Sequence, residues 1–409
     1  MSPPVGAARH RPHVVFVTRS CGFPEGMAAT NRVRLLGRAL LEHGVDVKVI
    51  CPRVTERPGA VINRRTRGVS EGIAFLYAPG CTVRSDSFVV RRSREARGFL
   101  VALVCLARLK RQGKLDCVYL PEVSKTWRPY ALVLRRWLDC LSVPVIAEVN
   151  ELPGSEAMLP EAVSRRLSHL DRVAGVVAIS GWLADWAAAE AARLGQHVEV
   201  AEVPIVVDVC EQEVTPYPQG TPMFVYSASD YFDVVTFILR AMKRVWKDHA
   251  ECRITMTGVN PEVVARLAVR EGLESALTDG RIAVTGYLER RELLLTYRSA
   301  AALLIPLSDD LESRARFPSK IGEYLASARP VVTTDVGEIE RFLRDGETAY
   351  VTAPGDVEAY GAKMLEVLND PARASCVGAA GRRVAEDRLQ YALYGPSLAA
   401  LIDTVSVRA

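Results

Sequence analysis

Short apolar runs alternate with longer amphipathic segments along most of the chain. In the first half the runs are continuous rather than alternating, which is typical of strands in a parallel sheet that helices cover on both faces. They predict strands over 13–18, 45–51, 73–78, 116–120, 143–149, 173–180 and 198–204. After the first strand, apolar residues recur at helical spacing and stop at Gly44, which predicts a helix over 29–44. The pattern therefore indicates a doubly wound α/β domain.

The pattern breaks once and then restarts. Residues 211–222, EQEVTPYPQGTP, are rich in proline and polar residues and show no period, so we interpret them as an interdomain linker. Further strands are predicted over 223–228, 252–258, 281–286, 301–306 and 330–334, with helical segments between them. The predicted domains are 1–210 and 223–387. Two such domains place a cleft between them, and ligands of such sheets bind beyond the carboxyl ends of the strands.

Composition narrows the class of protein. A chain of 409 residues is too long for one ordinary core, and 49% hydrophobic with 24% charged residues is normal for a soluble globular enzyme. The net charge of +4 argues against a nucleic-acid coat. The nine cysteines form no CxxC pair and predict reduced thiols in a cytosolic protein without a zinc site. We expect no signal peptide, and the longest apolar run, 99–107, is about half of a membrane span.

One stretch of the second half combines charges with a short predicted helix. In RFPSKIGEYLASARPVV, residues 316–332, Pro318 suits the first turn because its missing N–H is not needed there. Ser319 and Lys320 follow in that turn, and the charge of Lys320 opposes the helix dipole unless an anion binds there. Glu323 lies one turn further on about the same face, where a carboxylate can accept hydrogen bonds from a ribose. The alternative is a surface ion pair between Lys320 and Glu323.

The sequence around this stretch resembles a known family. Residues 316–370, which include SKIGEYLA, PVVTT and DGETAYV, are similar to the nucleotide-sugar-binding half of the family 4 glycosyltransferases, the glycosyl transferases group 1. The resemblance implies the GT-B fold, in which two Rossmann-like domains face a central cleft. It also implies that Glu323 binds the donor ribose as the second glutamate of the family's Glu-x7-Glu motif, whose first glutamate is replaced by Ala315.

The resemblance also implies the remaining donor contacts. Where family members often carry basic residues after the first strand of the second domain, this chain has Asp230 and Asp233. The diphosphate is therefore assigned to Arg316 and Lys320, with Arg314 third. The segment 286–293 is expected to line the base pocket through backbone groups. The predicted donor-binding residues are Gly26, Ser227, Gly286, Tyr287, Arg316, Pro318, Ser319, Lys320 and Glu323.

The first half resembles the family's acceptor side. Gly26 and Met27 stand at the family's glycine pair, where small residues permit close approach to a ligand; the alternative is that Gly26 only makes a turn. Asn150, followed by Glu151, stands where a histidine often lies near the donor sugar. The predicted acceptor-binding residues are Met27, Glu148, Asn150 and Glu151, and the candidate catalytic residues are Asn150, Glu151 and Lys320. Because the family's last helices cross back, residues 388–409 are expected to join the first domain.

The implied activity is retaining transfer of a sugar from a nucleoside diphosphate sugar, UDP favoured over GDP, to a hydroxyl or amine. The acceptor is expected to be a small molecule, a natural product or a lipid or polysaccharide precursor. We expect no metal, because no Asp-x-Asp motif follows a suitable strand of the donor half, and no cofactor beyond the co-substrate. Two alternatives remain: an epimerase acting on the nucleotide sugar itself, and a non-catalytic nucleotide-sugar-binding partner.

Arginine clusters at 64–67 and 91–97 leave the cellular location open. The second cluster leads into the apolar run 99–107, which suggests either a helix lying on an anionic bilayer or a core-packed helix with a solvated basic start. We expect a cytoplasmic protein, with peripheral contact to the inner face of the membrane as the alternative.

Overall fold

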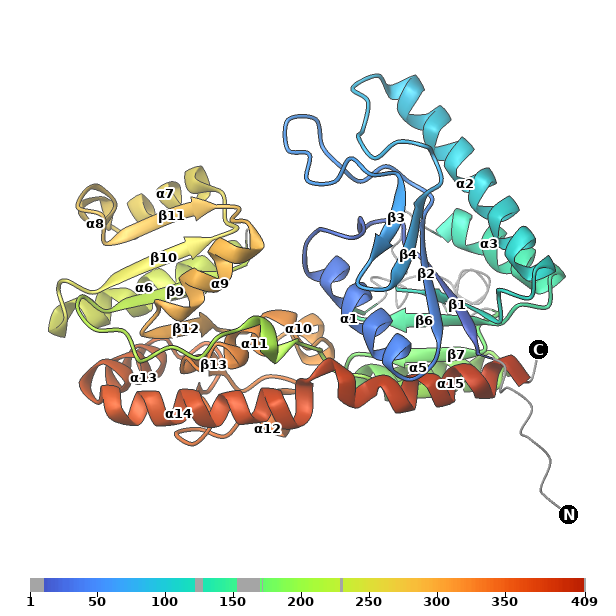
Figure 1. Ribbon diagram of the computed structural model, residues 1–409. Coiled ribbons are helices and arrows are strands. Elements are labelled where there is room, and N and C mark those ends of the chain that lie inside the picture. The colour runs from blue at the N-terminus through green and yellow to red at the C-terminus, as the bar shows by residue number, and fades with distance from the viewer. Residues whose placement is uncertain (1–10, 122–127, 153–169, 171, 229–230, 408–409) are drawn as a thin grey trace, which may run out of the picture. The chain divides into compact units, whose positions relative to one another are not determined.

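A computed structural model describes residues 11–121, 128–152, 170, 172–228 and 231–407 (Figure 1). The chain divides into two compact units. The first comprises residues 1–206 together with 391–409, and the second comprises 207–390. Each unit is built around its own parallel sheet, and the fold is α/β.

The first unit has a sheet of order β3-β4-β2-β1-β5-β6-β7-β8. All neighbours pair in parallel except β3 with β4, which are antiparallel. The strands are β1 (His13–Val17), β2 (Asp46–Cys51), β3 (Arg67–Ser70), β4 (Ile73–Tyr77), β5 (Cys117–Leu120), β6 (Val145–Val149), β7 (Gly175–Ala178) and β8 (Glu199–Glu202). The central strands are buried throughout, which accounts for their continuous apolar runs.

Five helices of this unit are described in full. They are α1 (Ala28–Glu42), α2 (Phe88–Arg111), α3 (Arg128–Cys140), α5 (Gly181–Arg193) and α15 (Gly395–Val407). Apolar residues of α1 and α15 pack into one core with β1 and β2. Residue 395, at the start of α15, must be glycine because a Cβ there would lie 2.1 Å from the ring of His43 and 2.7 Å from the carbonyl of Ala39. The last helix of the chain is therefore an integral part of the first unit.

The second unit has a fully parallel sheet of order β11-β10-β9-β12-β13-β14. Its strands are β9 (Met223–Ser227), β10 (Arg253–Thr257), β11 (Ile282–Gly286), β12 (Ala302–Ile305), β13 (Val331–Thr334) and β14 (Tyr350–Thr352). Its helices are α6 (Phe232–Asp248), α7 (Pro261–Arg270), α8 (Glu274–Thr278), α9 (Arg290–Arg298), α10 (Leu311–Ala315), α11 (Ser319–Ala326), α12 (Ile339–Phe342), α13 (Val357–Asn369) and α14 (Pro371–Val384). The apolar faces of α6, α7 and α13 form its main core with the sheet.

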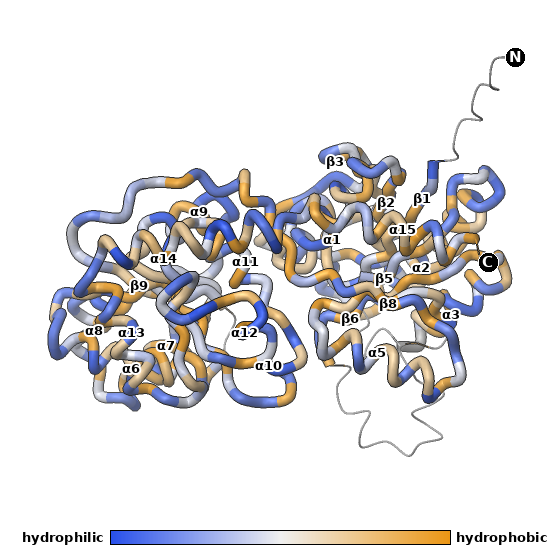
Figure 2. The backbone as a smooth tube through the Cα atoms, turned by 90° about the horizontal axis from the view of Figure 1, so that it is seen from below, coloured by the Kyte–Doolittle hydropathy of each residue, from blue (hydrophilic) through white to orange (hydrophobic). Residues whose placement is uncertain are grey.

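Three elements differ from the sequence prediction. Two strands were not predicted: β3, RGVS, which lies at the sheet edge and is more hydrophilic than β2 (Figure 2), and β14, which has only three residues. Neither offers an apolar run long enough to stand out. The short helix α10 lies within the charged segment expected to be a loop, and Asp310 caps it by accepting from the N–H of Ser313 at 2.7 Å.

The predicted linker is part of the second unit. The first unit ends at Val206 rather than at residue 210, since Val207 forms a bridge with Gln390. Residues that follow are tied to the second unit by side chains: Arg329 donates to the carbonyls of Thr215 and Pro216 at 3.2 and 2.7 Å, and the Tyr217 hydroxyl donates to the Ala301 carbonyl at 2.9 Å. Proline and polar composition predicted a free linker because these partners lie more than 80 residues away in sequence.

Candidate functional site

The candidate site is built around the start of α11 in the second unit. Pro318 is the N-cap residue of this helix rather than its first-turn residue, and its carbonyl accepts from the N–H of Ile321 at 3.1 Å. Ser319 and Lys320 begin the helix, and the first turn contains no acid. A positive side chain at this end is unfavourable for the helix dipole, so other groups must stabilise it.

Glu323 supplies the nearest compensating charge. Glu323 is only 6% exposed, and its Oε2 lies 3.1 Å from the Lys320 Nζ. The Oε1 atom accepts from Arg290 Nη1 at 2.6 Å. Arg290 in turn donates to Glu211 Oε2 through Nε at 3.1 Å and Nη2 at 2.6 Å. The Lys320–Glu323 ion pair is thus one link of a four-residue network and is not a pair on the surface.

The network keeps Glu323 ionised despite its burial. Burial alone would raise the pKa of Glu323, but the charges of Lys320 and Arg290 lower it below its ordinary value. Burial would likewise lower the pKa of Arg290, and the carboxylates of Glu323 and Glu211 raise it instead. Glu323 therefore presents a fixed negative charge, with further lone pairs that hydroxyl groups can use.

Two tyrosines connect this network to the end of β9. The Lys320 Nζ lies 3.2 Å from the Tyr297 hydroxyl, and the rings of Tyr297 and Tyr324 meet edge to face at 5.0 Å. The Tyr324 hydroxyl accepts from the backbone N–H of Ser227 at 2.8 Å. Ser227 is the last residue of β9, so the start of α11 is fixed beside the carboxyl end of the central strand.

Arg316 also reaches the segment that follows β9. Its Nη1 lies 3.3 Å from the Tyr231 hydroxyl and 3.1 Å from Glu312 Oε1, and its guanidinium lies 5.4 Å from the centre of the Tyr231 ring. The structure thus brings Arg316 to the segment where the family resemblance leads one to look for a basic residue. Arg314, the third candidate, pairs with Asp309 at 2.6 Å.

The proposed base contacts lie at the carboxyl end of β11. Gly286 has a φ of +65°, which favours glycine, and its carbonyl accepts from the N–H of Gly258 at 2.6 Å. Tyr287 is 58% exposed. Both residues belong to the same edge of the sheet as Ser227, because all strands of this sheet run parallel.

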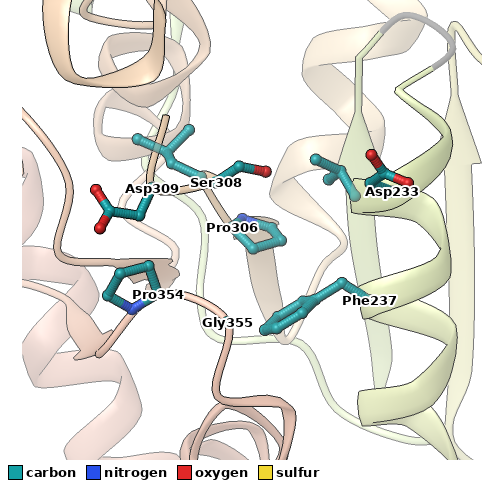
Figure 3. A pocket seen from close by; sticks show the side chains of 9 residues that line it. Asp233, Phe237, Pro306, Ser308, Asp309, Pro354 and Gly355 are labelled. Carbon is teal, nitrogen blue, oxygen red and sulfur yellow. The ribbon is translucent and has the colours of Figure 1, made fainter. Parts of the chain in front are cut away.

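A pocket of about 240 Å³ lies at the same edge but involves other residues (Figure 3). Asp233 and Phe237 approach it from α6, Pro306 and Asp309 from the segment after β12, and Gly355 from the segment before α13. None of the donor-binding candidates lines it. Two carboxylates and no cation are unsuited to a diphosphate, so we do not place the nucleotide there.

Glu148 lies in the interior of the first unit. It was expected to contact the acceptor, but it is 2% exposed and forms an ion pair with Arg32 of α1. Arg32 also donates to the carbonyls of Val203 and Pro204 at 2.8 and 2.6 Å. The ion pair joins β6 to α1, and the second carboxylate oxygen of Glu148, Oε2, is buried without a hydrogen-bond partner among the described residues.

The other first-unit candidates have different surroundings. Met27 is the N-cap residue of α1 and is 68% exposed, whereas Gly26 is packed so that a Cβ would lie 2.2 Å from the Thr30 hydroxyl. This contact explains a glycine at position 26 without a ligand. Asn150 follows β6, is half-buried, and its Oδ1 has no hydrogen-bond partner among the described residues; Glu151 is exposed. Residues 153–159 of the expected acceptor loop lie outside the described ranges.

Sequence reasoning missed two residues of the network, Arg290 and Glu211, and the neighbouring Tyr297. Arg290 and Tyr297 are separated from Glu323 by 33 and 26 residues, and Glu211 was counted as part of the linker. The sequence signal was weak: an arginine pair in GYLERREL reads as a solvated helix start. Within the described ranges, no group of three or more His, Cys, Asp or Glu side chains is arranged to hold a metal ion.

Comparison with known proteins identifies the class. Residues 221–370 match the family model of the glycosyl transferases group 1. A stretch covering 36% of the chain is 27% identical to the sulfoquinovosyl transferase SQD2 of Arabidopsis thaliana, and it spans only 27% of that protein. Sucrose-phosphate synthase from Thermosynechococcus elongatus superposes over 97% of this chain and 100% of its own, with a TM-score of 0.70 and 15% identity. Anabaena HepE in complex with UDP and glucose covers 95% of this chain and 99% of its own, with a TM-score of 0.65 and 11% identity.

The structural similarities show the GT-B fold, which the chain shares with these glycosyltransferases. More particularly, residues 221–370 of the second unit are similar to the glycosyl transferases group 1. The expected GT-B fold and the expected resemblance to the glycosyl transferases group 1 are therefore confirmed.

Proposed function

We propose that this chain is a retaining glycosyltransferase that takes a sugar from a nucleoside diphosphate donor. The observation that carries the proposal is the fixed charge arrangement at the carboxyl ends of β9 and β12: a buried, ionised Glu323 one turn from a cationic helix start. An acid held there suits the hydroxyls of a ribose, and Lys320 and Arg316 suit the diphosphate. The position of this arrangement within the group 1 segment supports it.

We propose UDP as the nucleotide of the donor, with GDP as the second choice. HepE, which shares the fold, was solved with UDP-glucose as well as with UDP, and this supports a uridine donor. The base would meet the backbone at Gly286 and the exposed ring of Tyr287.

The proposed chemistry is stabilisation of the departing diphosphate. As the bond from the anomeric carbon to the phosphate oxygen breaks, negative charge grows on the diphosphate, and the cations of Arg316 and Lys320 would stabilise it. The acceptor hydroxyl or amine forms the new bond on the same face, and the leaving phosphate is suited to take its proton. We assign no metal to this step. Asn150 and Glu151 remain candidates for contacts to the sugar and acceptor.

Two measurements test the proposal. A thermal-shift titration with UDP, GDP and ADP should show stabilisation by UDP that follows mass action, RT ln(1 + [L]/Kd). Hydrolysis of a UDP-sugar in the absence of acceptor, followed by proton NMR, should release the sugar first as the anomer present in the donor. Release of the opposite anomer would exclude retention, and no response to any nucleotide would exclude the function.

The two alternatives predict other products. An epimerase would return an altered nucleotide sugar without acceptor, and a non-catalytic partner would bind the nucleotide without turnover. Ala315, which replaces the family's first glutamate, is 0% exposed and leaves no carboxylate at that position to contact the donor sugar. Mass spectrometry of a UDP-sugar incubated with the protein distinguishes the three outcomes.

We also propose a peripheral membrane contact through α2. One face of this helix packs on the unit through Glu95, Gly98, Ala102 and Leu106. On the opposite face Leu100 is 61% and Val104 48% exposed, and the last turn of the helix carries Arg108, Lys110 and Arg111. Trp137 of α3, 38% exposed, lies beside it and donates from Nε1 to the Leu103 carbonyl at 3.2 Å. Apolar side chains flanked by cations suit an anionic bilayer. None of the helices in the described ranges has the length and apolar content required to cross a membrane.

A further inference from the structure

Arginine side chains converge at the carboxyl edge of the sheet in the first unit. Arg19 follows β1, Arg53 follows β2, and Arg92 lies in the second turn of α2. Arg84 lies just before α2 and is tied to the segment after β2, because its N–H donates to the Glu56 carbonyl at 2.9 Å. The cluster formed by Arg19, Arg53, Arg84 and Arg92 thus gathers charge from four separate segments.

A buried carboxylate, that of Glu95, lies within this arginine cluster. Glu95 of α2 is 4% exposed, and its two oxygens lie 2.7 Å from Arg53 Nε and 2.8 Å from Arg92 Nη1. Arg19, Arg53 and Glu95 line one small cavity together with the rings of Phe99 and Tyr130. The guanidinium of Arg19 lies 4.6 Å from the centre of the Tyr130 ring.

The positive charge of the cluster exceeds what Glu95 balances. Even without Arg19, three guanidinium groups act on one carboxylate. Burial and the charges of Arg53 and Arg57 lower the pKa of Arg84, and burial and Arg53 lower that of Arg19. The Nε of Arg84 is also buried and has no hydrogen-bond partner among the described residues. Such an arrangement is costly in the free protein and becomes favourable when an anion binds.

We propose that this arginine cluster binds a phosphate group of the acceptor, so that the enzyme uses a phosphorylated acceptor. The proposal rests on the proposed function and names the acceptor class for it. Guanidinium groups from separate elements can bind the oxygens of one phosphate, and a dianion matches the excess charge better than a second carboxylate does. The carboxyl edge of the sheet, where β1 and β2 end, is where ligands of such domains bind. The phosphate can belong to a soluble sugar phosphate or to a lipid headgroup.

The test uses the full chain saturated with UDP, so that phosphate binding at the second unit does not contribute. Glucose 6-phosphate is titrated and followed by ³¹P NMR, with glucose as the uncharged comparison. We expect glucose 6-phosphate to bind to the wild type. Arg84→Gln should weaken this binding about 10- to 100-fold and leave the Kd for UDP unchanged. Arg92→Gln, which leaves Arg53 on Glu95, should weaken it as well. The matched control Arg111→Gln lies about 28 Å along α2 from Arg92 and should have no effect.

A second arm distinguishes the source of the phosphate. Vesicles of phosphatidylcholine with phosphatidic acid are sedimented with wild type, Arg84→Gln and the exposed control Arg266→Gln. If Arg84→Gln, but not the matching control, loses binding of glucose 6-phosphate or of the vesicles, the site is supported. The ligand whose binding is lost identifies the source of the phosphate. The proposed phosphate site is overturned if Arg84→Gln binds both ligands as the wild type does. It is also overturned if the UDP-saturated wild type binds neither ligand. UDP binding is measured in the same samples. A protein that does not bind UDP would contradict the proposed function, and this result is distinct from a failure of the phosphate site.

Discussion

Replacing Glu323 by alanine tests the assignment of the ribose site most directly. Its carboxylate is nearly inaccessible to bulk solvent, so a hydrogen bond from a ribose hydroxyl would not be weakened by screening. A hydrogen bond to a charged group contributes about 1.5–3 kcal/mol, which corresponds to a factor of about 10 to 100 in Kd. We therefore expect Glu323→Ala to weaken UDP binding by about that factor.

The same substitution also affects stability, and the structure indicates how much. Without Glu323, Arg290 keeps Glu211 and Lys320 keeps the Tyr297 hydroxyl. Neither cation is left alone, so the loss should fall below the 3–5 kcal/mol typical of breaking a buried pair, at about 1–3 kcal/mol. Urea unfolding measures this term, and binding is then compared under conditions where both proteins are folded.

Comparing UDP with 2′-deoxy-UDP separates the ribose contact from a general effect on the site. Wild type should prefer UDP by about tenfold or more, and Glu323→Ala should bind the two alike. Glu271→Ala is the matched control, because Glu271 also bridges an arginine and a lysine, Arg240 at 2.9 Å and Lys243 at 3.2 Å. If Glu323→Ala keeps the preference for UDP, Glu323 does not bind the ribose and the reasoning is refuted.

Three further predictions concern Lys320, the ionisation of Glu323 and the exposed apolar side chains of α2. Lys320→Ala should weaken the binding of UDP about tenfold or more and that of uridine little, as measured by titration calorimetry. Equal losses of affinity for the two ligands would mean that Lys320 does not contact the phosphate. The pKa of Glu323 is lowered in the folded state, so its contribution to stability is present above the ordinary value of about 4.3 and is lost as pH falls below it. The difference in unfolding free energy between wild type and Glu323→Gln should therefore shrink between pH 7 and pH 3.5, and a constant difference would contradict the ion-paired state. Leu100→Asp with Val104→Asp should reduce sedimentation with anionic vesicles severalfold, while Val69→Asp at the exposed position of β3 should not; equal binding would exclude α2 as the contact.

Much of the fold could be predicted because each core strand is a continuous apolar run. All seven strands predicted in the first half and all five in the second are present. The two that were missed, β3 and β14, are short and depend on neighbours for their assignment. The end of the first unit was placed four residues late because the bridge between Val207 and Gln390 joins residues far apart in the sequence.

The candidate site was predictable only where its residues are close in sequence. Lys320 and Glu323 share one turn of a helix, so their proximity follows from helix geometry. Their partners Arg290 and Glu211 come from other segments, and no local pattern indicates that they meet. Glu148 is a similar case: its position near the end of β6 suggested a ligand contact, and its pairing with Arg32, 116 residues away, has no local signal in the sequence.

By itself the sequence determined the two α/β halves, the short cationic helix and the family resemblance, since these depend on local periodicity and on contiguous motifs. Only the tertiary structure decided that Glu323 is buried and ionised within a four-residue network, and that arginines from four segments share one carboxylate. The physical reason is that electrostatic energies depend on distances and burial across the fold, and residues that are far apart along the chain set both.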